Sequence, residues 1–146
     1  MFQRIVVPTD FSDCAEAAWG LAREIAAMSK GEIVLMHVLT EVPRYGEGLF
    51  IVESAQRIMD SARTWAEAAL EERITKARAE GIRARSTLRT GMPHDEIVGL
   101  ARDERADLIV IGTHGRGGMS RVMLGSVADR VVRLAPCPVL TVREPA

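Results

Sequence analysis

Residues 33–38 read Ile33-Val34-Leu35-Met36-His37-Val38, a nearly continuous run of apolar side chains. A strand of this composition is buried on both faces, which is typical of a parallel strand in a sheet covered by helices on both sides. Two further runs that are largely apolar occupy residues 5–7 and 107–111, and turn-forming residues follow each of them. These runs predict the buried strands of an α/β protein.

Two amphipathic segments follow the first two strands. In residues 14–28 the apolar side chains recur at three- and four-residue steps, which predicts a helix that ends at Lys30-Gly31 and has one apolar row: Ala17, Leu21, Ile25 and Met28. A longer segment ends near Gly81, and its apolar row consists of Ile58, Ala62, Trp65, Ala69 and Ile74. Residues 40–49, which include Pro43, predict the loop before this second helix.

Two shorter helices are predicted in the second half of the chain. Pro93 suits the first turn of one helix, whose inward residues are Ile97, Leu100 and Ala101. Ser126 and Asp129 have the spacing of a capping box that begins the last helix, and Pro136 ends it.

The strands and helices alternate regularly along the chain. The strands are predicted at residues 5–7, 33–38, 82–89, 107–111 and 138–142. The third of these alternates only weakly, which favours an edge position. An alternation of this kind requires right-handed crossovers and a parallel sheet with helices on both faces. We therefore expect a single doubly wound α/β domain over residues 1–146.

Composition argues against several classes of partner. The chain of 146 residues has a net charge of −1, so no overall positive field would attract nucleic acid or acidic lipid. No apolar run approaches the ~20 residues of a membrane span. Cys14 and Cys137 form no CxxC pair, and residues 1–10 have the pattern of a strand rather than of a signal peptide. We expect a cytoplasmic protein with inert thiols that binds neither nucleic acid nor membrane.

A binding site is expected where the strands end. Ligands of open parallel sheets bind beyond the carboxyl ends of the strands, near the point where the strand order reverses. These ends carry Pro8-Thr9-Asp10, Val38 and Gly112. Asp10 is a natural acceptor for ribose hydroxyls, although it is equally suited to cap the first helix.

The glycine-rich segment after the fourth strand favours an anion. Gly115, Gly117 and Gly118 can point successive N–H groups at phosphate oxygens, and Arg116 adds charge. Gly125-Ser126 lies at a helix N-terminus, where unpaired N–H groups attract phosphate and a glycine lets the backbone approach closely. Neither the P-loop pattern nor the dinucleotide fingerprint is present.

Several of these residues also have a purely structural interpretation. Ser126 suits an N-cap as well as a phosphate contact, and the two roles are compatible. We expect His37 to be a core histidine with a hydrogen-bond partner and His94 to lie on the surface. For His114 a solvated loop position is favoured over acid–base catalysis.

The spacing of the glycines identifies a family. Gly112, Gly115, nine further residues and Gly125-Ser126 reproduce the GxxGx9G[ST] motif, and the chain thereby resembles the ATP-binding branch of the universal stress protein family. The likeness extends over nearly the whole chain, through the segments 7–13, 35–39, 91–98, 107–118, 124–133 and 137–143. No clear departure from the family pattern is present.

The resemblance implies a strand order of 3-2-1-4-5, an adenosine pocket between the first and fourth strands, and a homodimer through the fifth. ATP with Mg²⁺ is the implied ligand. Its implied neighbours are Pro8, Thr9, Asp10, Val38, Ile111, Gly112, Gly115, Arg116, Gly117, Gly125, Ser126 and Val127.

We expect a nucleotide-dependent regulatory module in the stress response that acts on an unidentified protein partner. A slow ATPase and a nucleotide-free structural dimer remain the alternatives. The sequence has no convincing base, lysine or metal-binding carboxylate pair near the glycines, so no catalytic or metal-ligating residue is assigned.

Overall fold

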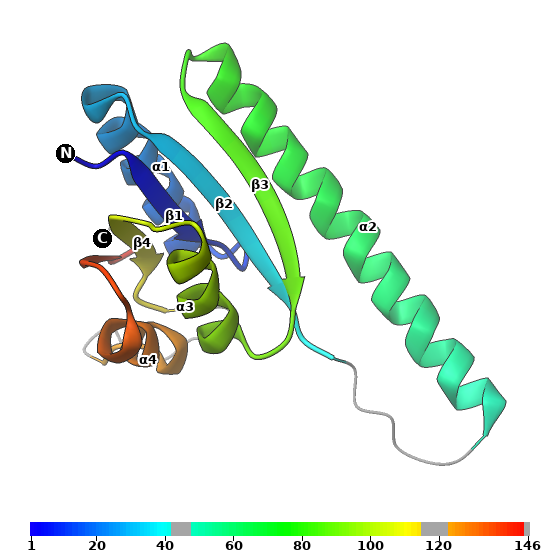
Figure 1. Cartoon of the computed structure of the whole chain (residues 1–146). Coiled ribbons are helices and arrows are strands. Elements are labelled where there is room, and N and C mark those ends of the chain that lie inside the picture. The colour runs from blue at the N-terminus through cyan, green and yellow to red at the C-terminus, as the bar shows by residue number, and fades with distance from the viewer. Residues whose placement is uncertain (42–47, 115–122, 145–146) are drawn as a thin grey trace.

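The computed structural model describes residues 1–41, 48–114 and 123–144. Its elements are β1 (Arg4–Pro8), α1 (Asp13–Ser29), β2 (Glu32–Leu39), α2 (Leu49–Ala79), β3 (Arg83–Thr90), α3 (Pro93–Asp103), β4 (Leu108–Gly112), α4 (Ser126–Leu134) and β5 (Val139–Val142). Figure 1 shows their arrangement along the chain. Of the predicted loop 40–49, residues 42–47 lie outside the described residues, and Leu49 already belongs to α2.

The strands form one parallel sheet in the order β3-β2-β1-β4-β5. The predicted α/β architecture and strand order are therefore confirmed, including the edge position of β3. The order reverses at β1, which pairs with β2 on one side and with β4 on the other. The carboxyl ends of β1 and β4 consequently lie side by side, at the position where parallel sheets of this kind bind ligands.

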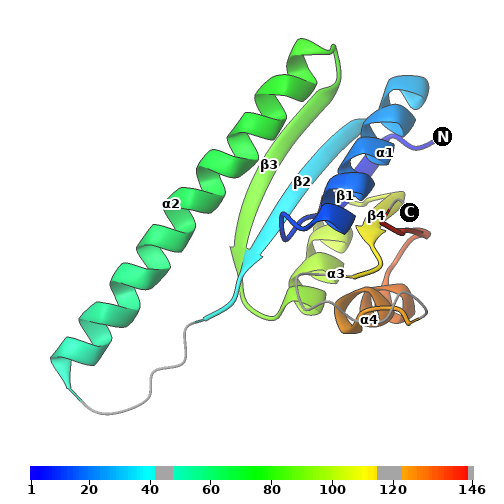
Figure 2. The same cartoon turned by 180° about the vertical axis from the view of Figure 1, so that it is seen from behind.

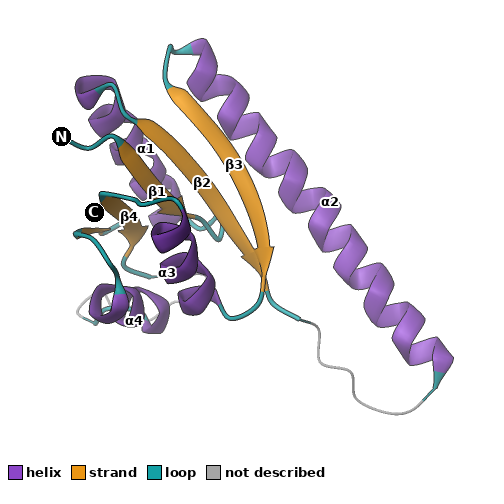
Figure 3. Ribbon diagram, viewed as in Figure 1, coloured by secondary structure: helices purple, strands orange, loops and turns teal. Residues whose placement is uncertain are grey.

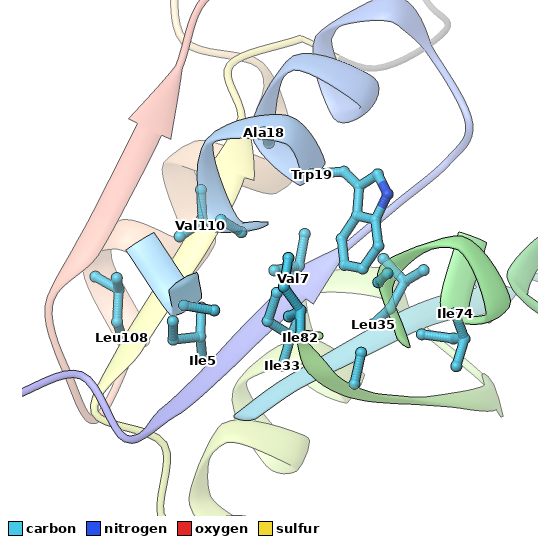
Figure 4. Close-up of a cluster of buried hydrophobic side chains, with 14 of the residues drawn as sticks. Ile5, Val7, Ala18, Trp19, Ile33, Leu35, Ile74, Ile82, Leu108 and Val110 are labelled. Carbon is cyan, nitrogen blue, oxygen red and sulfur yellow. The ribbon is translucent and has the colours of Figure 1, made fainter. Parts of the chain in front are cut away.

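Two hydrophobic clusters hold helices against the two faces of the sheet. One cluster joins the sheet to α1 and α2, and its centre is formed by Ile5, Val7, Ile33, Leu35 and Val110 (Figure 4). The other joins the sheet to α3 and α4 through residues such as Val34, Ile97 and Val131. Figures 1 and 3 show α3 and α4 on the near face, and Figure 2 shows α1 on the opposite one.

The buried face of α1 is not its predicted apolar row. Small side chains face the sheet instead, namely Ala15, Ala18, Ala22 and Ala26, beside the buried Trp19. Leu21 and Ile25 are only half-buried, and Met28 is 79% exposed. Alanines let the helix axis approach the strands closely, whereas the longer side chains fit along the margin of the contact.

The apolar row predicted for α2 is also largely wrong. Ile74 is buried as expected, but Ile58 and Trp65 are each 55% exposed. The other buried residues of α2 are Ala55, Ala66, Leu70 and Ala77. With 31 residues α2 is ~46 Å long, whereas the eight residues of β3 span only ~26 Å. The N-terminal half of α2 therefore extends past the sheet (Figures 1 and 2).

An ionic cluster closes the amino edge of the sheet, opposite the binding edge. Arg4 and Arg85 each contact Glu32 and Glu104, which links three strands to the end of α3. The Arg85 guanidinium beside Glu104 is the main cause that holds the pKa of this carboxyl below 4.5. The same contact raises the pKa of Arg85.

Candidate functional site

A cavity of about 390 Å³ opens at the carboxyl edge of the sheet, between β1 and β4. It is lined by nine of the residues expected from the sequence: Pro8, Thr9, Asp10, Val38, Ile111, Gly112, Gly125, Ser126 and Val127. The other three expected residues, Gly115, Arg116 and Gly117, lie outside the described residues. The lining also includes Ala15, Met36, His37, Thr40, Pro93, Ile97, Thr113, His114 and Ala128, which the sequence did not single out for this cavity.

The turn after β1 is fixed by its own side chains. Thr9 Oγ1 accepts a hydrogen bond from the Phe11 N–H at 3.0 Å, and Asp10 Oδ1 accepts one from the Ser12 N–H at 3.0 Å. Ser12 is the N-cap of α1, and its Oγ accepts from the Ala15 N–H. Asp10 is therefore not the cap of this helix. Its carboxylate forms an Asx-type turn at the wall of the cavity.

The start of α4 is held against the end of β4. The Gly125 N–H donates to the Thr113 carbonyl at 2.7 Å, and a Cβ on Gly125 would lie only 2.8 Å from that oxygen. Gly125 thus allows a close approach to the protein's own backbone, and its predicted approach to phosphate stays a prediction. Its φ of −61° is ordinary, so the glycine is required for space rather than for conformation.

The capping box predicted at Ser126 is not formed. Gly125 is the N-cap, Ser126 is the first helical residue, and no side chain caps this end of α4. The Asp129 N–H is the first to bond back, to the Gly125 carbonyl. Within the described part of the chain, the N–H groups of Ser126, Val127 and Ala128 thus have no intrahelical acceptor, and all three residues line the cavity.

Gly112, a residue of the cavity wall, allows β4 and α1 to approach each other closely. A Cβ at this position would lie 2.9 Å from the backbone carbon of Cys14. Any side chain on Gly112 would therefore push the first turn of α1 away from β4. The Cys14 thiol itself is buried and lies 3.7 Å from Thr113 Oγ1.

The three histidines differ from one another. His37 Nδ1 donates to the Thr9 carbonyl at 2.7 Å, which confirms the expected hydrogen bond, but the residue is only half-buried and lines the cavity rather than the core. His94 is less exposed than expected for a surface residue, because its side chain is 13% exposed and its Nε2 lies near both Asp95 and Arg130.

His114 also departs from its expected solvated position. Its Nδ1 lies 3.1 Å from Thr113 Oγ1, and its Nε2 is buried with no hydrogen-bond partner among the described residues. A buried polar atom without a partner costs free energy. This atom belongs to a residue that lines the cavity.

The fold and the cavity define the class of protein to which the chain belongs. An open parallel sheet with a cavity at its carboxyl edge defines a large class of ligand-binding α/β proteins. Within this class, the model of the universal stress protein family matches residues 1–143, and the chain belongs to that family. It is 36% identical over 145 residues to universal stress protein MJ0531 of Methanocaldococcus jannaschii, an alignment that covers 99% of this chain and 84% of the relative.

Solved structures agree with the fold over almost the full chain. MJ0577 of the same organism superimposes with a TM-score of 0.87 at 29% identity, covering 100% of this chain and 99% of the other. A universal stress protein in complex with cAMP gives 0.73 at 28% identity, covering 99% and 98%. The Archaeoglobus fulgidus protein in complex with dAMP gives 0.66 at 28% identity, covering 97% and 98%.

No helix in the described ranges is both long and apolar enough to cross a membrane.

Proposed function

We propose that the cavity between β1 and β4 binds an adenine nucleotide, with ATP as the preferred ligand, and that the protein acts as a nucleotide-dependent regulatory module. The observation that carries this proposal is the convergence of three groups on one cavity: an apolar wall, the Asp10 carboxylate and the start of α4. The cAMP and dAMP complexes of two relatives with the same fold support it.

Each part of the nucleotide has a matching part of the wall. Apolar side chains such as Met36, Val38 and Ile111 offer a surface for adenine. Asp10 would accept hydrogen bonds from ribose hydroxyls. The phosphates would lie at the N-terminus of α4, where the helix dipole and N–H groups without an acceptor among the described residues favour negative charge.

The phosphate end has further candidate donors. His114, which lines the cavity, is one candidate. Gly115, Arg116 and Gly117 remain predicted neighbours of the phosphates on the strength of the glycine spacing. Mg²⁺ would come with the triphosphate and keep water ligands, since the described residues hold no cluster of three His, Cys, Asp or Glu side chains.

Binding rather than rapid turnover fits the residues of the cavity. Fast phosphoryl transfer requires charge stabilisation of the phosphates and a positioned base or water. Among the described residues of the wall there is no lysine, and Asp10 is the one carboxylate. One oxygen of that carboxylate already accepts a hydrogen bond from the Ser12 amide.

The cytoplasm remains the proposed location of the protein.

Native mass spectrometry of the purified protein tests the proposal. We expect a mass increment of one adenine nucleotide per chain, or, for protein freed of ligand, saturable 1:1 binding of ATP in calorimetry. Adenosine should bind more weakly because it lacks the phosphates, and GTP should bind more weakly because its base differs. Failure of folded, ligand-free protein to bind ATP at millimolar concentration would contradict the proposal. Rapid release of phosphate would instead favour the ATPase alternative.

A further inference from the structure

Phe11 has an unusual backbone conformation beside the cavity. Its φ is +65°, in the left-handed region that bulky residues rarely adopt. Lys30 and Arg105 also have positive φ among the described non-glycine residues, but they follow the ends of α1 and α3, where this conformation is common. Phe11 instead lies between β1 and the N-cap of α1. Such an outlier persists only where the surroundings hold it in place.

The ring of Phe11 is enclosed by residues of two other elements. The centroid of the His37 ring lies 4.8 Å away, and the Trp65 ring meets Phe11 edge-on at 5.0 Å. The Arg73 guanidinium lies 4.9 Å from the Phe11 centroid. Arg73 is held in turn by Glu16, whose Oε1 lies 2.8 Å from the Arg73 Nε. We call His37, Trp65 and Arg73 the Phe11 cage.

Phe11 itself does not line the cavity, but both of its predecessors do. Thr9 and Asp10 are wall residues, and Thr9 Oγ1 accepts the Phe11 N–H. His37, a member of the cage, also donates to the Thr9 carbonyl. The cage is thus joined to the cavity wall both through the chain at Phe11 and through the His37 hydrogen bond.

We propose that Phe11 is a positioning residue for nucleotide binding: its ring, held by the cage, keeps the turn in the conformation that presents Asp10 to the ribose. This inference rests on the proposed function. Without the ring, residue 11 returns to a common φ, and the carboxylate of Asp10 moves away from the cavity. The cage, formed by residues of β2 and α2, therefore determines recognition of the sugar at the cavity wall.

The test compares ATP with 2′,3′-dideoxy-ATP, which lacks the ribose hydroxyls, by calorimetry. Wild type should bind ATP about tenfold more tightly than the dideoxy compound, because only ATP can donate to Asp10. In Phe11→Ala this ratio should fall to about one, through loss of ATP affinity alone. Phe11→Gly accepts the positive φ but has no ring and should behave like Phe11→Ala. Phe11→Tyr keeps the ring and should retain the ratio.

Phe2→Ala is the matched control. Phe2 also packs on the cluster beneath α1 and α2, but it precedes β1 at the amino edge of the sheet, away from the cavity. Its loss should lower the melting temperature without changing the ratio. Trp65→Ala gives a second variant in case Phe11→Ala does not fold: Trp65 is half-exposed, and removal of one cage residue should lower the ratio severalfold.

The outcomes separate the inference from the proposed function. If wild type does not bind ATP, the proposed function is wrong. If wild type binds ATP but does not distinguish it from the dideoxy compound, or if folded Phe11 and Trp65 variants keep the wild-type ratio, the inference is wrong and the proposed function stands. Equal loss of both ligands in those variants would also overturn it, since that result indicates general damage to the cavity.

Discussion

The Gly125 amide donates to the Thr113 carbonyl at 2.7 Å, so the first turn of α4 begins in direct contact with the end of β4. Because a Cβ at residue 125 would lie 2.8 Å from the same oxygen, Gly125→Ala should displace the N-terminus of α4. We expect ATP affinity to fall about tenfold, or ~1.4 kcal/mol, as measured by calorimetry.

Gly99→Ala is the matched control for this substitution. Gly99 lies within α3, and the nearest atom to a Cβ there is Arg89 Nη1 at 3.7 Å, an ordinary contact. The helix should gain about 0.5 to 1 kcal/mol of stability in urea unfolding, with ATP affinity unchanged. Wild-type affinity in Gly125→Ala would show that the α4 terminus does not contact the nucleotide.

Asp10→Ala should weaken ATP binding by roughly 1 to 3 kcal/mol, the scale for a lost hydrogen bond to a charged group. Asp10→Asn keeps an acceptor for the Ser12 amide and should therefore preserve stability better than Asp10→Ala. Asp13→Ala removes the same charge three residues along, at an exposed site outside the wall, and should leave the affinity unchanged. If Asp10→Ala and Asp13→Ala bind ATP equally well, Asp10 serves only the turn.

The ionic cluster at the amino edge makes stability depend on pH. The pKa of Glu104 is lower in the folded protein than the usual 4.5, chiefly because of Arg85. Its stabilising contribution is therefore complete above the unfolded pKa and is lost as pH falls through the folded pKa. Since Glu104 is 21% and Arg85 38% exposed, Glu104→Gln should cost only about 0.5 to 1 kcal/mol at pH 7.

Urea unfolding at a series of pH values measures this contribution. The difference between wild type and Glu104→Gln should shrink below about pH 4.5, where the unfolded chain begins to bind the proton. Glu24→Gln, on the exposed side of α1, should show no such difference. A gap between wild type and Glu104→Gln that stays constant from pH 7 to pH 3 would exclude the ionic explanation.

We predict a homodimer through β5, which is an edge strand of the sheet in the described part of the chain. All four residues of β5 are uncharged and half-buried, whereas the other edge strand, β3, carries Arg83, Arg85 and Arg89. Charged side chains discourage pairing of an exposed edge. The carbonyls of Pro138 and Val142 accept from the N–H groups of Ile109 and Thr113, so by alternation the backbone polar groups of Thr141 point away from β4.

Analytical ultracentrifugation tests this arrangement. Wild type should sediment as a dimer at micromolar concentration. Thr141→Pro, which removes one outward N–H, should shift the equilibrium toward monomer, while Thr141→Ala keeps that amide and the dimer. A monomeric wild type would contradict the prediction.

The sequence predicts the sheet well because its signals are local. The apolar runs around Val6, Leu35 and Val110 are long enough to identify buried strands, and the alternation with helices restricts the topology to a parallel sheet. The order 3-2-1-4-5 came from the family resemblance, since periodicity does not specify which strands pair.

Helix orientation was predicted poorly because packing depends on shape as well as polarity. In α1 the alanines face the sheet, although Leu21 and Ile25 are more apolar. In α2 the helix is longer than the neighbouring strand β3, and Ile58, in the N-terminal half of the helix, is 55% exposed. Periodicity identifies an apolar row without indicating whether a neighbouring element covers it.

The sequence predicted the residues of the candidate site that belong to a motif. It did not predict those that act through contacts between distant parts of the chain. Gly112 and Gly125 followed from the glycine spacing, but their close contacts with Cys14 and Thr113 join segments that are far apart in the chain. The positive φ of Phe11 leaves no signal in the sequence either, because phenylalanine is an uncommon residue in that conformation.

The central claim, that the carboxyl edge between β1 and β4 binds ATP, is tested most directly by mapping amide chemical shifts of the ¹⁵N-labelled protein during an ATP titration. The account predicts saturable shifts at Asp10, Val38, Gly112, Ser126 and Val127, with Arg83 and Asp107 at the opposite edge unchanged. The absence of shifts at saturating ATP, or shifts confined to residues away from this cavity, would contradict it.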